Sequence, residues 1–188
     1  MILSYCKKAV VLLFPLVAYA GPVPTWQIVP NESTLVFTGI QNNAPVSGKF
    51  THFTGDIKFD PTALANSSVK IVVDIDSITA SYKDLVDTLK TKDWFDVKSF
   101  PQAVFVSKQF QMTGGNTYQV TGTLTVRDKT QPLTLNFQVT ESSNNKAKVT
   151  GSTTIKRTAF GVGQGEWSGT NEVKDDVKVN FSLSVIKK

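Results

Sequence analysis

Apolar and polar residues alternate with a period of two along several long segments of the chain. The clearest segments are residues 35–40, 69–76, 133–140 and 177–185. In residues 133–140, LTLNFQVT, every second side chain is apolar and the side chains between are polar. Successive side chains of a β-strand point to opposite faces, whereas a helix needs apolar residues spaced three and four apart. These segments are therefore predicted to be antiparallel strands with one apolar and one solvated face.

Four further segments are rich in Val, Thr, Ile and Phe, which fit the pleated surface of a sheet. They are residues 46–59, 103–112, 117–127 and 146–156, and they bring the number of long strands to about eight. Stretches rich in Gly, Asn and Ser separate several of them and are typical of hairpin turns. Such strands pack either as two facing sheets or as one closed barrel.

One stretch has a helical period instead. In residues 81–91, SYKDLVDTLKT, the apolar Leu85, Val86 and Leu89 fall on one side of a helix. This pattern predicts a short amphipathic helix with Ser81 as its N-cap, and residues 61–65 are a candidate for one more helical turn. About eight strands and one inserted helix favour the barrel. The predicted fold is an all-β, eight-stranded antiparallel barrel with one short inserted helix.

The first twenty residues have the features of a secretory signal peptide. Two lysines, Lys7 and Lys8, precede the apolar run of residues 9–17, and small residues lead up to Ala20. The apolar run is much shorter than the roughly 20 residues that span a bilayer. We therefore expect cleavage after Ala20, one domain at residues 21–188, and a periplasmic or secreted location.

Cysteine and charge exclude several classes of site. The only cysteine, Cys6, lies in the predicted signal peptide, so the rest of the chain has no disulfide, thiolate metal site or cysteine nucleophile. The chain has 20 Lys and Arg against 15 Asp and Glu, and removing Lys7 and Lys8 leaves an excess of three. The basic residues are scattered singly, so we expect no nucleic-acid partner.

The residues that could support catalysis are few. His52 is the only histidine, and no G-x-S-x-G elbow occurs. One histidine cannot hold a zinc ion alone. Carboxylate pairs such as Asp84 and Asp87 are predicted to lie on solvated faces. We therefore expect no enzyme activity, no catalytic residue and no metal ion, and a hydrolase that uses His52 is kept only as a third hypothesis.

Five motifs in order resemble the YceI-like family. They are residues 26–37, 48–61, 84–105, 122–135 and 155–163, and together they cover nearly the whole chain after the signal peptide. The resemblance implies a lipocalin-like barrel whose long apolar interior binds a polyisoprenoid chain, such as an isoprenoid quinone or a polyprenyl relative. Residues 160–167, FGVGQGEW, are similar to members found beside membrane b-type cytochromes. The sequence departs from many members at Thr88, where they carry a histidine that precedes the leucine of the helix motif.

Large apolar side chains are the candidates for contact with such a chain. The resemblance implies that they line the interior, although aromatic residues also fill the cores of most β proteins. Arg157, which ends a predicted strand, is a weaker candidate for holding a polar head group. The predicted lining consists of Phe37, Phe50, Phe53, Phe59, Trp94, Phe95, Phe105, Leu124, Phe137, Phe160 and Phe181.

The leading hypothesis is a periplasmic carrier or store for an isoprenoid lipid, with no covalent cofactor. The alternative is an interaction partner of a membrane b-type cytochrome, or a stress-related module, without a bound lipid. Whether the chain forms a homodimer is left open.

Overall fold

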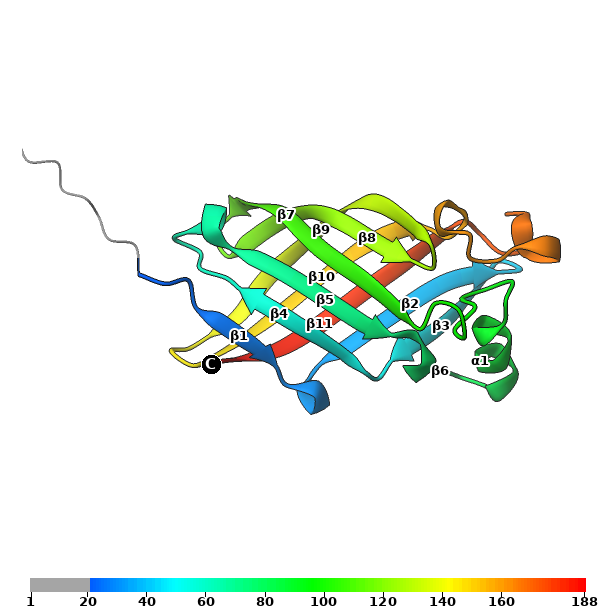
Figure 1. Ribbon diagram of the computed structural model, residues 1–188, viewed down its shortest axis with the longest axis horizontal. Helices are drawn as coiled ribbons and strands as arrows, with labels where there is room; N and C mark the ends of the chain where they lie inside the picture. Colours follow the sequence, from blue (N-terminus) through cyan, green and yellow to red (C-terminus); the bar gives the residue numbers. More distant parts are fainter. Residues whose placement is uncertain (1–20) are drawn as a thin grey trace, which may run out of the picture.

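Eight antiparallel strands form a closed barrel, and three of them are each broken into two segments (Figure 1). The computed structural model describes residues 21–188, so the predicted signal peptide lies outside the described part. Within these residues, the single α-helix is α1 (Lys83–Lys90). Short 3-10 turns lie at Pro30–Glu32, Leu64–Asn66, Ile75–Ser77, Thr158–Phe160 and Gly165–Ser168. The strands are β1 (Thr25–Ile28), β2 (Thr34–Gln41), β3 (Ala44–Phe50), β4 (Phe53–Lys58), β5 (Ser68–Asp74), β6 (Ile78–Ala80), β7 (Gln102–Gly114), β8 (Thr117–Val126), β9 (Lys129–Ser142), β10 (Lys146–Lys156) and β11 (Asp176–Lys187).

Each strand pairs with the next one along the chain, and the last strand returns to the first. β7 to β11 form a continuous meander, in which Val149 of β10 lies between Val139 of β9 and Leu183 of β11. The ring closes because β11 pairs with both β1 and β2. The prediction of an eight-stranded antiparallel barrel with one helix is confirmed.

The predicted strand at residues 46–59 is in fact two strands, β3 and β4, with a break at residues 51–52. Phe50 and Phe53 are three residues apart, yet both border the barrel interior. One regular strand would place them on opposite faces. The break shifts the in–out alternation by one position, so that both side chains can point inward. The turn between β5 and β6 does the same for Ile75 and Ile78, which are both 3% exposed.

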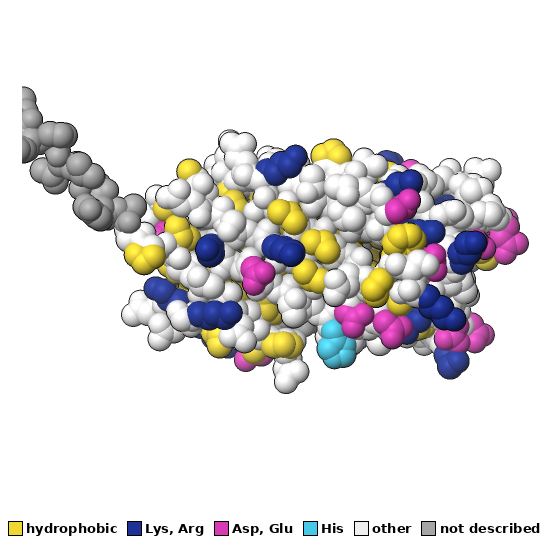
Figure 2. Space-filling model, in the orientation of Figure 1, with side chains coloured by type: hydrophobic (Ala, Val, Ile, Leu, Met, Phe, Trp, Pro, Cys, Tyr) yellow, Lys and Arg dark blue, Asp and Glu magenta, His cyan; other side chains and the backbone are white. Residues whose placement is uncertain are grey.

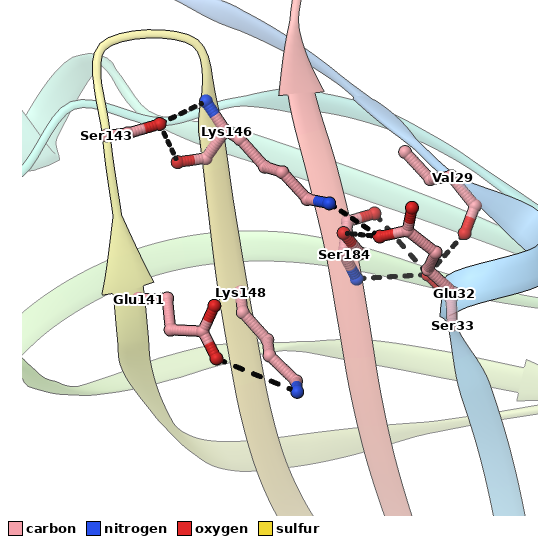
Figure 3. Close-up of polar contacts among 8 residues, drawn as sticks. All are labelled: Val29, Glu32, Ser33, Glu141, Ser143, Lys146, Lys148 and Ser184. Carbon is pink, nitrogen blue, oxygen red and sulfur yellow. Dashed lines mark hydrogen bonds and ion pairs between the residues drawn. The ribbon is translucent and has the colours of Figure 1, made fainter.

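A polar cluster connects the break between β1 and β2 to strand β11 (Figure 3). The Glu32 carboxylate accepts hydrogen bonds from Lys146 Nζ at 2.7 Å and from Ser184 Oγ at 2.8 Å. The Ser33 hydroxyl donates to the carbonyl oxygen of Val29 at 2.8 Å and accepts from the backbone N–H of Ser184 at 3.0 Å. The hydrogen bond from Lys146 lowers the pKa of Glu32, and the bond from Ser184 adds to this.

Helix α1 and two long connections cover one end of the barrel, and the two ends of the described chain lie at the other (Figure 1). The connections are residues 91–101 and 157–175. They meet where the backbone N–H of Gly163 donates to the carbonyl oxygen of Asp93 at 2.8 Å. The rings of Trp94 and Trp167 also pack there, with centroids 5.7 Å apart.

Two local predictions at this level were wrong. The helix begins at Lys83, its N-cap is Tyr82, and no side chain caps it, so Ser81 is not the cap. The extra turn lies at Leu64–Asn66, slightly later than residues 61–65, and it is a 3-10 turn. Among residues 21–188, no helix has the length and apolar character needed to cross a membrane.

Candidate functional site

The barrel interior is a cavity of about 840 Å³ whose walls are almost entirely apolar. Every strand of the ring contributes inward side chains to it. All eleven apolar residues predicted to line a ligand-binding interior border this cavity; whether they contact a ligand stays a prediction. They are Phe37, Phe50, Phe53, Phe59, Trp94, Phe95, Phe105, Leu124, Phe137, Phe160 and Phe181.

Many aliphatic side chains share the wall with these residues. Val149 on β10 and Val179 on β11 border the cavity but belong to none of the packed hydrophobic clusters. They therefore border the open cavity without packing against the buried clusters. The sequence prediction did not name them, although their inward position follows from the alternation along their strands.

An aromatic cluster narrows the end of the cavity where the termini lie. Phe59 packs edge-on against Tyr118 with ring centroids 5.2 Å apart, and Tyr118 stacks on Phe137 at 5.3 Å. Phe110 completes the cluster, and Phe110 and Tyr118 are 7% and 5% exposed. These rings interlock in the edge-to-face and offset arrangements that aromatic side chains prefer, so this end has a rigid apolar floor.

Asn116 and Thr140, which border the cavity at this end, are bonded to protein, whereas the hydroxyls of Tyr118 and Ser142 form no hydrogen bond within residues 21–188. Asn116 Nδ2 donates to the carbonyl oxygen of Val139 at 2.6 Å, and Asn116 Oδ1 accepts from Gln138 Nε2 at 3.1 Å. The Thr140 hydroxyl donates to the carbonyl oxygen of Lys148 at 3.2 Å. A ligand group that approached Asn116 or Thr140 would have to compete with these bonds.

Only two charged side chains in residues 21–188 border the cavity, Asp84 and Arg157. Arg157 is 2% exposed and packs near the Trp94 ring, with its Cζ atom 5.8 Å from the ring centroid. Its five N–H groups all donate to backbone carbonyl oxygens, a number that uses every donor of a guanidinium. The acceptors are Lys174 (from Nε, 3.2 Å), Val162 and Gly163 (from Nη1, 3.0 and 3.3 Å), and Gly169 and Val173 (from Nη2, 2.6 and 2.9 Å).

This arrangement gives Arg157 a structural task. It organises residues 158–174, the connection that covers the barrel end, and it has no N–H group left for a ligand. Burial lowers the pKa of the Arg157 guanidinium, and the charge of Asp175 opposes that shift. Burial alone would raise the pKa of Asp175, but the backbone N–H and the hydroxyl of Thr158, at 3.0 and 2.8 Å, donate to its carboxylate and lower the pKa.

At the α1 end, four polar side chains border the cavity. Tyr82, Asp84 and Thr88 come from the helix and its N-cap, and Gln41 comes from the end of β2. Tyr82 is 53% exposed and Asp84 is also exposed, so solvent reaches these two side chains. Among the described residues, the side chains of these four form no hydrogen bond or ion pair with one another or with any neighbour.

Asp84 and Asp87 are both exposed, as predicted, but Asp84 also borders the cavity. The carboxylate of Asp87 pairs with Lys83 Nζ at 2.6 Å on the outer surface of α1. Asp84 is one turn earlier and borders the cavity. The sequence pattern could not separate them, because both positions are polar and only the docking of α1 decides which one faces the barrel.

Outside the barrel, the residues considered for catalysis do not assemble. His52 is exposed at the break between β3 and β4, and its Nδ1 lies 3.2 Å from the hydroxyl of the adjacent Thr51. Within residues 21–188, no group of three or more His, Cys, Asp and Glu side chains is placed to hold a metal ion. Figure 2 shows lysine and arginine side chains scattered over the face in view rather than gathered in one patch.

Comparison with known proteins places this barrel in a family. A UPF0312 protein of Vibrio parahaemolyticus is 29% identical over 100 residues, which are 53% of each chain, so the chain spans about half the length of the curated relatives it matches. The crystal structure of BcnA from Burkholderia cenocepacia is 37% identical, with a TM-score of 0.80 over 84% of this chain and 98% of that one.

A polyisoprenoid binding domain from Saccharophagus degradans has the same fold, with a TM-score of 0.68 over 88% of this chain and 99% of that one, at 15% identity. The family model described as the YceI-like domain matches residues 26–185, which include all eleven strands nearly in full. The chain therefore belongs to the YceI-like family.

Proposed function

We propose that this protein holds the apolar chain of an isoprenoid lipid in its barrel, as an exported carrier or store. The observation that carries the proposal is the cavity of about 840 Å³ with almost wholly apolar walls. Its volume lies in the range of about 300–1,000 Å³ that is usual for small-molecule sites. The polyisoprenoid binding domain from Saccharophagus degradans, which shares the fold, supports this choice of ligand.

The energetics of the cavity favour a guest. Dry cavities in protein cores cost about 24 cal/mol per Å³. At that rate, leaving 840 Å³ empty would cost on the order of 20 kcal/mol, against a net stability of about 5–15 kcal/mol for a typical domain. Water is a poor filler because the walls offer few polar partners. An apolar ligand recovers dispersion contacts that neither vacuum nor water supplies.

Burial of the apolar chain of the lipid is enough to give useful affinity. One isoprene unit has about five apolar carbons, so its burial contributes about 3–4 kcal/mol before ordering costs. Three or four units contribute on the order of 10–15 kcal/mol. Micromolar binding needs about 8 kcal/mol, which leaves room for the entropy lost when a flexible chain is ordered. No catalytic group is required for this function.

The proposed location follows from the sequence of residues 1–20, and an isoprenoid quinone is one ligand that the chemistry allows. Purification of the exported protein without detergent, followed by organic extraction and mass spectrometry, tests both points. We expect a mature chain that begins at Gly21 and an isoprenoid lipid in the extract. An empty extract from a protein that also fails to bind added farnesol would overturn the proposal. A membrane cytochrome that co-purifies with lipid-free protein would support the alternative instead.

A further inference from the structure

We infer that the polar end of the ligand lies at the α1 end of the cavity and that this head group is uncharged, so that anionic diphosphates are disfavoured. The inference rests on the proposed function and adds to it the chemical class of the head group and the orientation of the ligand. It depends on how the charged and polar side chains are distributed along an otherwise apolar wall.

The two ends of the cavity differ in what they can offer a polar group. At the end near the termini, four aromatic rings pack together, Asn116 and Thr140 are bonded to protein, and only the hydroxyls of Tyr118 and Ser142 form no hydrogen bond within residues 21–188. At the α1 end, Tyr82, Asp84 and Thr88 border the cavity with no protein partner among residues 21–188. With Gln41, the α1 end therefore offers a head group four unbonded polar side chains, one of them a carboxylate, against two hydroxyls at the opposite end.

No free cation borders the cavity to receive an anion. Arg157 is the only basic residue of the described chain on the wall, and its five N–H groups are all committed to backbone carbonyl oxygens. The two lysines of α1 are paired as well: Lys83 with Asp87 at 2.6 Å and Lys90 with Asp76 at 2.7 Å. Burying an anion without a counter-charge is costly.

Asp84 is the only acidic residue of the described chain that borders the cavity, and its charge has the wrong sign for binding a diphosphate. The Asp84 carboxylate borders the cavity and has no cationic partner in residues 21–188. Like charges at short range repel, and the repulsion is stronger beside a low-dielectric wall than in bulk water. A hydroxyl head group can instead donate to Asp84, and a carbonyl can accept from the hydroxyl of Thr88 or the amide of Gln41. The mouth therefore matches an alcohol or a quinone-like carbonyl.

A pair of ligands with the same chain and different head groups tests this inference. Farnesol and farnesyl diphosphate would each displace a neutral apolar dye, N-phenyl-1-naphthylamine, from the delipidated protein, below the concentration at which either ligand forms micelles. We expect farnesol to bind about tenfold more tightly than the diphosphate at low salt. The Asp84→Asn variant should narrow this ratio about threefold, whereas Asp56→Asn, which removes the same charge from the exposed face of β4 without breaking an ion pair, should leave the ratio unchanged.

The outcomes separate the two proposals. If neither ligand displaces the dye, the proposed function itself fails. If the diphosphate binds as tightly as the alcohol or more tightly, lipid holding stands and the head-group inference is overturned. If the alcohol is preferred but Asp84→Asn changes nothing, the placement of the head group at the α1 end is overturned. Asp84 is exposed at the start of the helix, so its replacement by Asn should leave the fold intact.

Discussion

Replacing Val149 with phenylalanine should make the delipidated protein more stable and its lipid binding weaker. In a filled core, an enlarged side chain strains its neighbours and usually destabilises the protein by about 1–3 kcal/mol. Val149 borders the cavity and belongs to no packed cluster, so a larger side chain has space to enter. The opposite signs of the two effects distinguish a hollow barrel from a packed one.

The expected magnitude follows from the atoms added. Phenylalanine carries four more side-chain carbons than valine, worth about 3 kcal/mol if all were fully buried at roughly 0.8 kcal/mol each. Part of the new ring still faces the remaining cavity, so we expect a gain of about 1 kcal/mol. For a domain of this size that gain raises the melting temperature by about 2–4 °C. The ring also occupies space that the lipid chain would use, so retention of an isoprenoid should fall.

Urea unfolding and lipid extraction of the same preparation measure the two effects. The matched control is Thr150→Phe, which adds a ring to the adjacent position on the outer face of β10, where Thr150 pairs with Gln138 and Ser182. That variant should change stability by no more than about 0.5 kcal/mol and leave lipid content unchanged. If Val149→Phe instead destabilises the delipidated protein by about 1–3 kcal/mol, the interior is already packed and the cavity argument is refuted.

Three further predictions concern the polar groups. Arg157→Met should cost at least about 3 kcal/mol in urea unfolding because five carbonyl oxygens lose a charged donor, whereas Lys156→Met on the surface should change little; a cost below about 1 kcal/mol for Arg157→Met would contradict its structural role. Because the pKa of Asp175 is lowered, its carboxylate stabilises the fold above the ordinary carboxyl pKa, and this stabilisation is lost as the pH falls through the lowered pKa. Asp175→Asn should therefore make the free energy of unfolding less dependent on pH in acid. An unchanged pH dependence would argue against the contact with Thr158. His52→Ala should leave lipid content unchanged, since the side chain lies outside the barrel; a lower content would show that the break between β3 and β4 affects the cavity.

The period-two pattern predicted the barrel because it reports directly which face of each strand is buried. The pattern did not show where a strand is broken and the in–out alternation shifts by one residue. The prediction joined residues 46–59 into one strand although Phe50 and Phe53 cannot both point inward in a regular strand. That odd spacing was visible in the sequence and could have located the break. The spacing of Ile75 and Ile78 carries the same information.

The residues that line the interior could be predicted, but whether the interior is hollow could not. Alternation fixes the direction of a side chain and not the volume left between opposite walls. Phe59 and Phe110 face inward and pack against each other, whereas Val149 borders the open cavity without packing against the buried clusters. The difference depends on the diameter of the ring and on how the strands are staggered, which no single segment encodes.

Arg157 shows the same limit for a polar residue. Its position at a strand end suits either a surface charge or a head-group contact. Its burial depends on carbonyl oxygens of residues 162–174, which converge only after that connection has folded. Gly163, with φ of 80°, is needed there because a Cβ atom would collide with the guanidinium. These carbonyl oxygens are brought around Arg157 only by the tertiary structure, so no local sequence pattern predicts the arrangement.

The way the ring closes has a consequence for folding and for aggregation. Every neighbouring pair of strands is close in sequence except the pairing of β11 with β1 and β2, so only that step has to order nearly the whole chain at once. At one end the closure depends on β1, a strand of four residues held between β4 and β11. Loss of this strand would expose the backbone N–H and C=O groups of two sheet edges, the kind of surface on which another chain can add. This strand of only four residues thus protects the protein from edge-to-edge association.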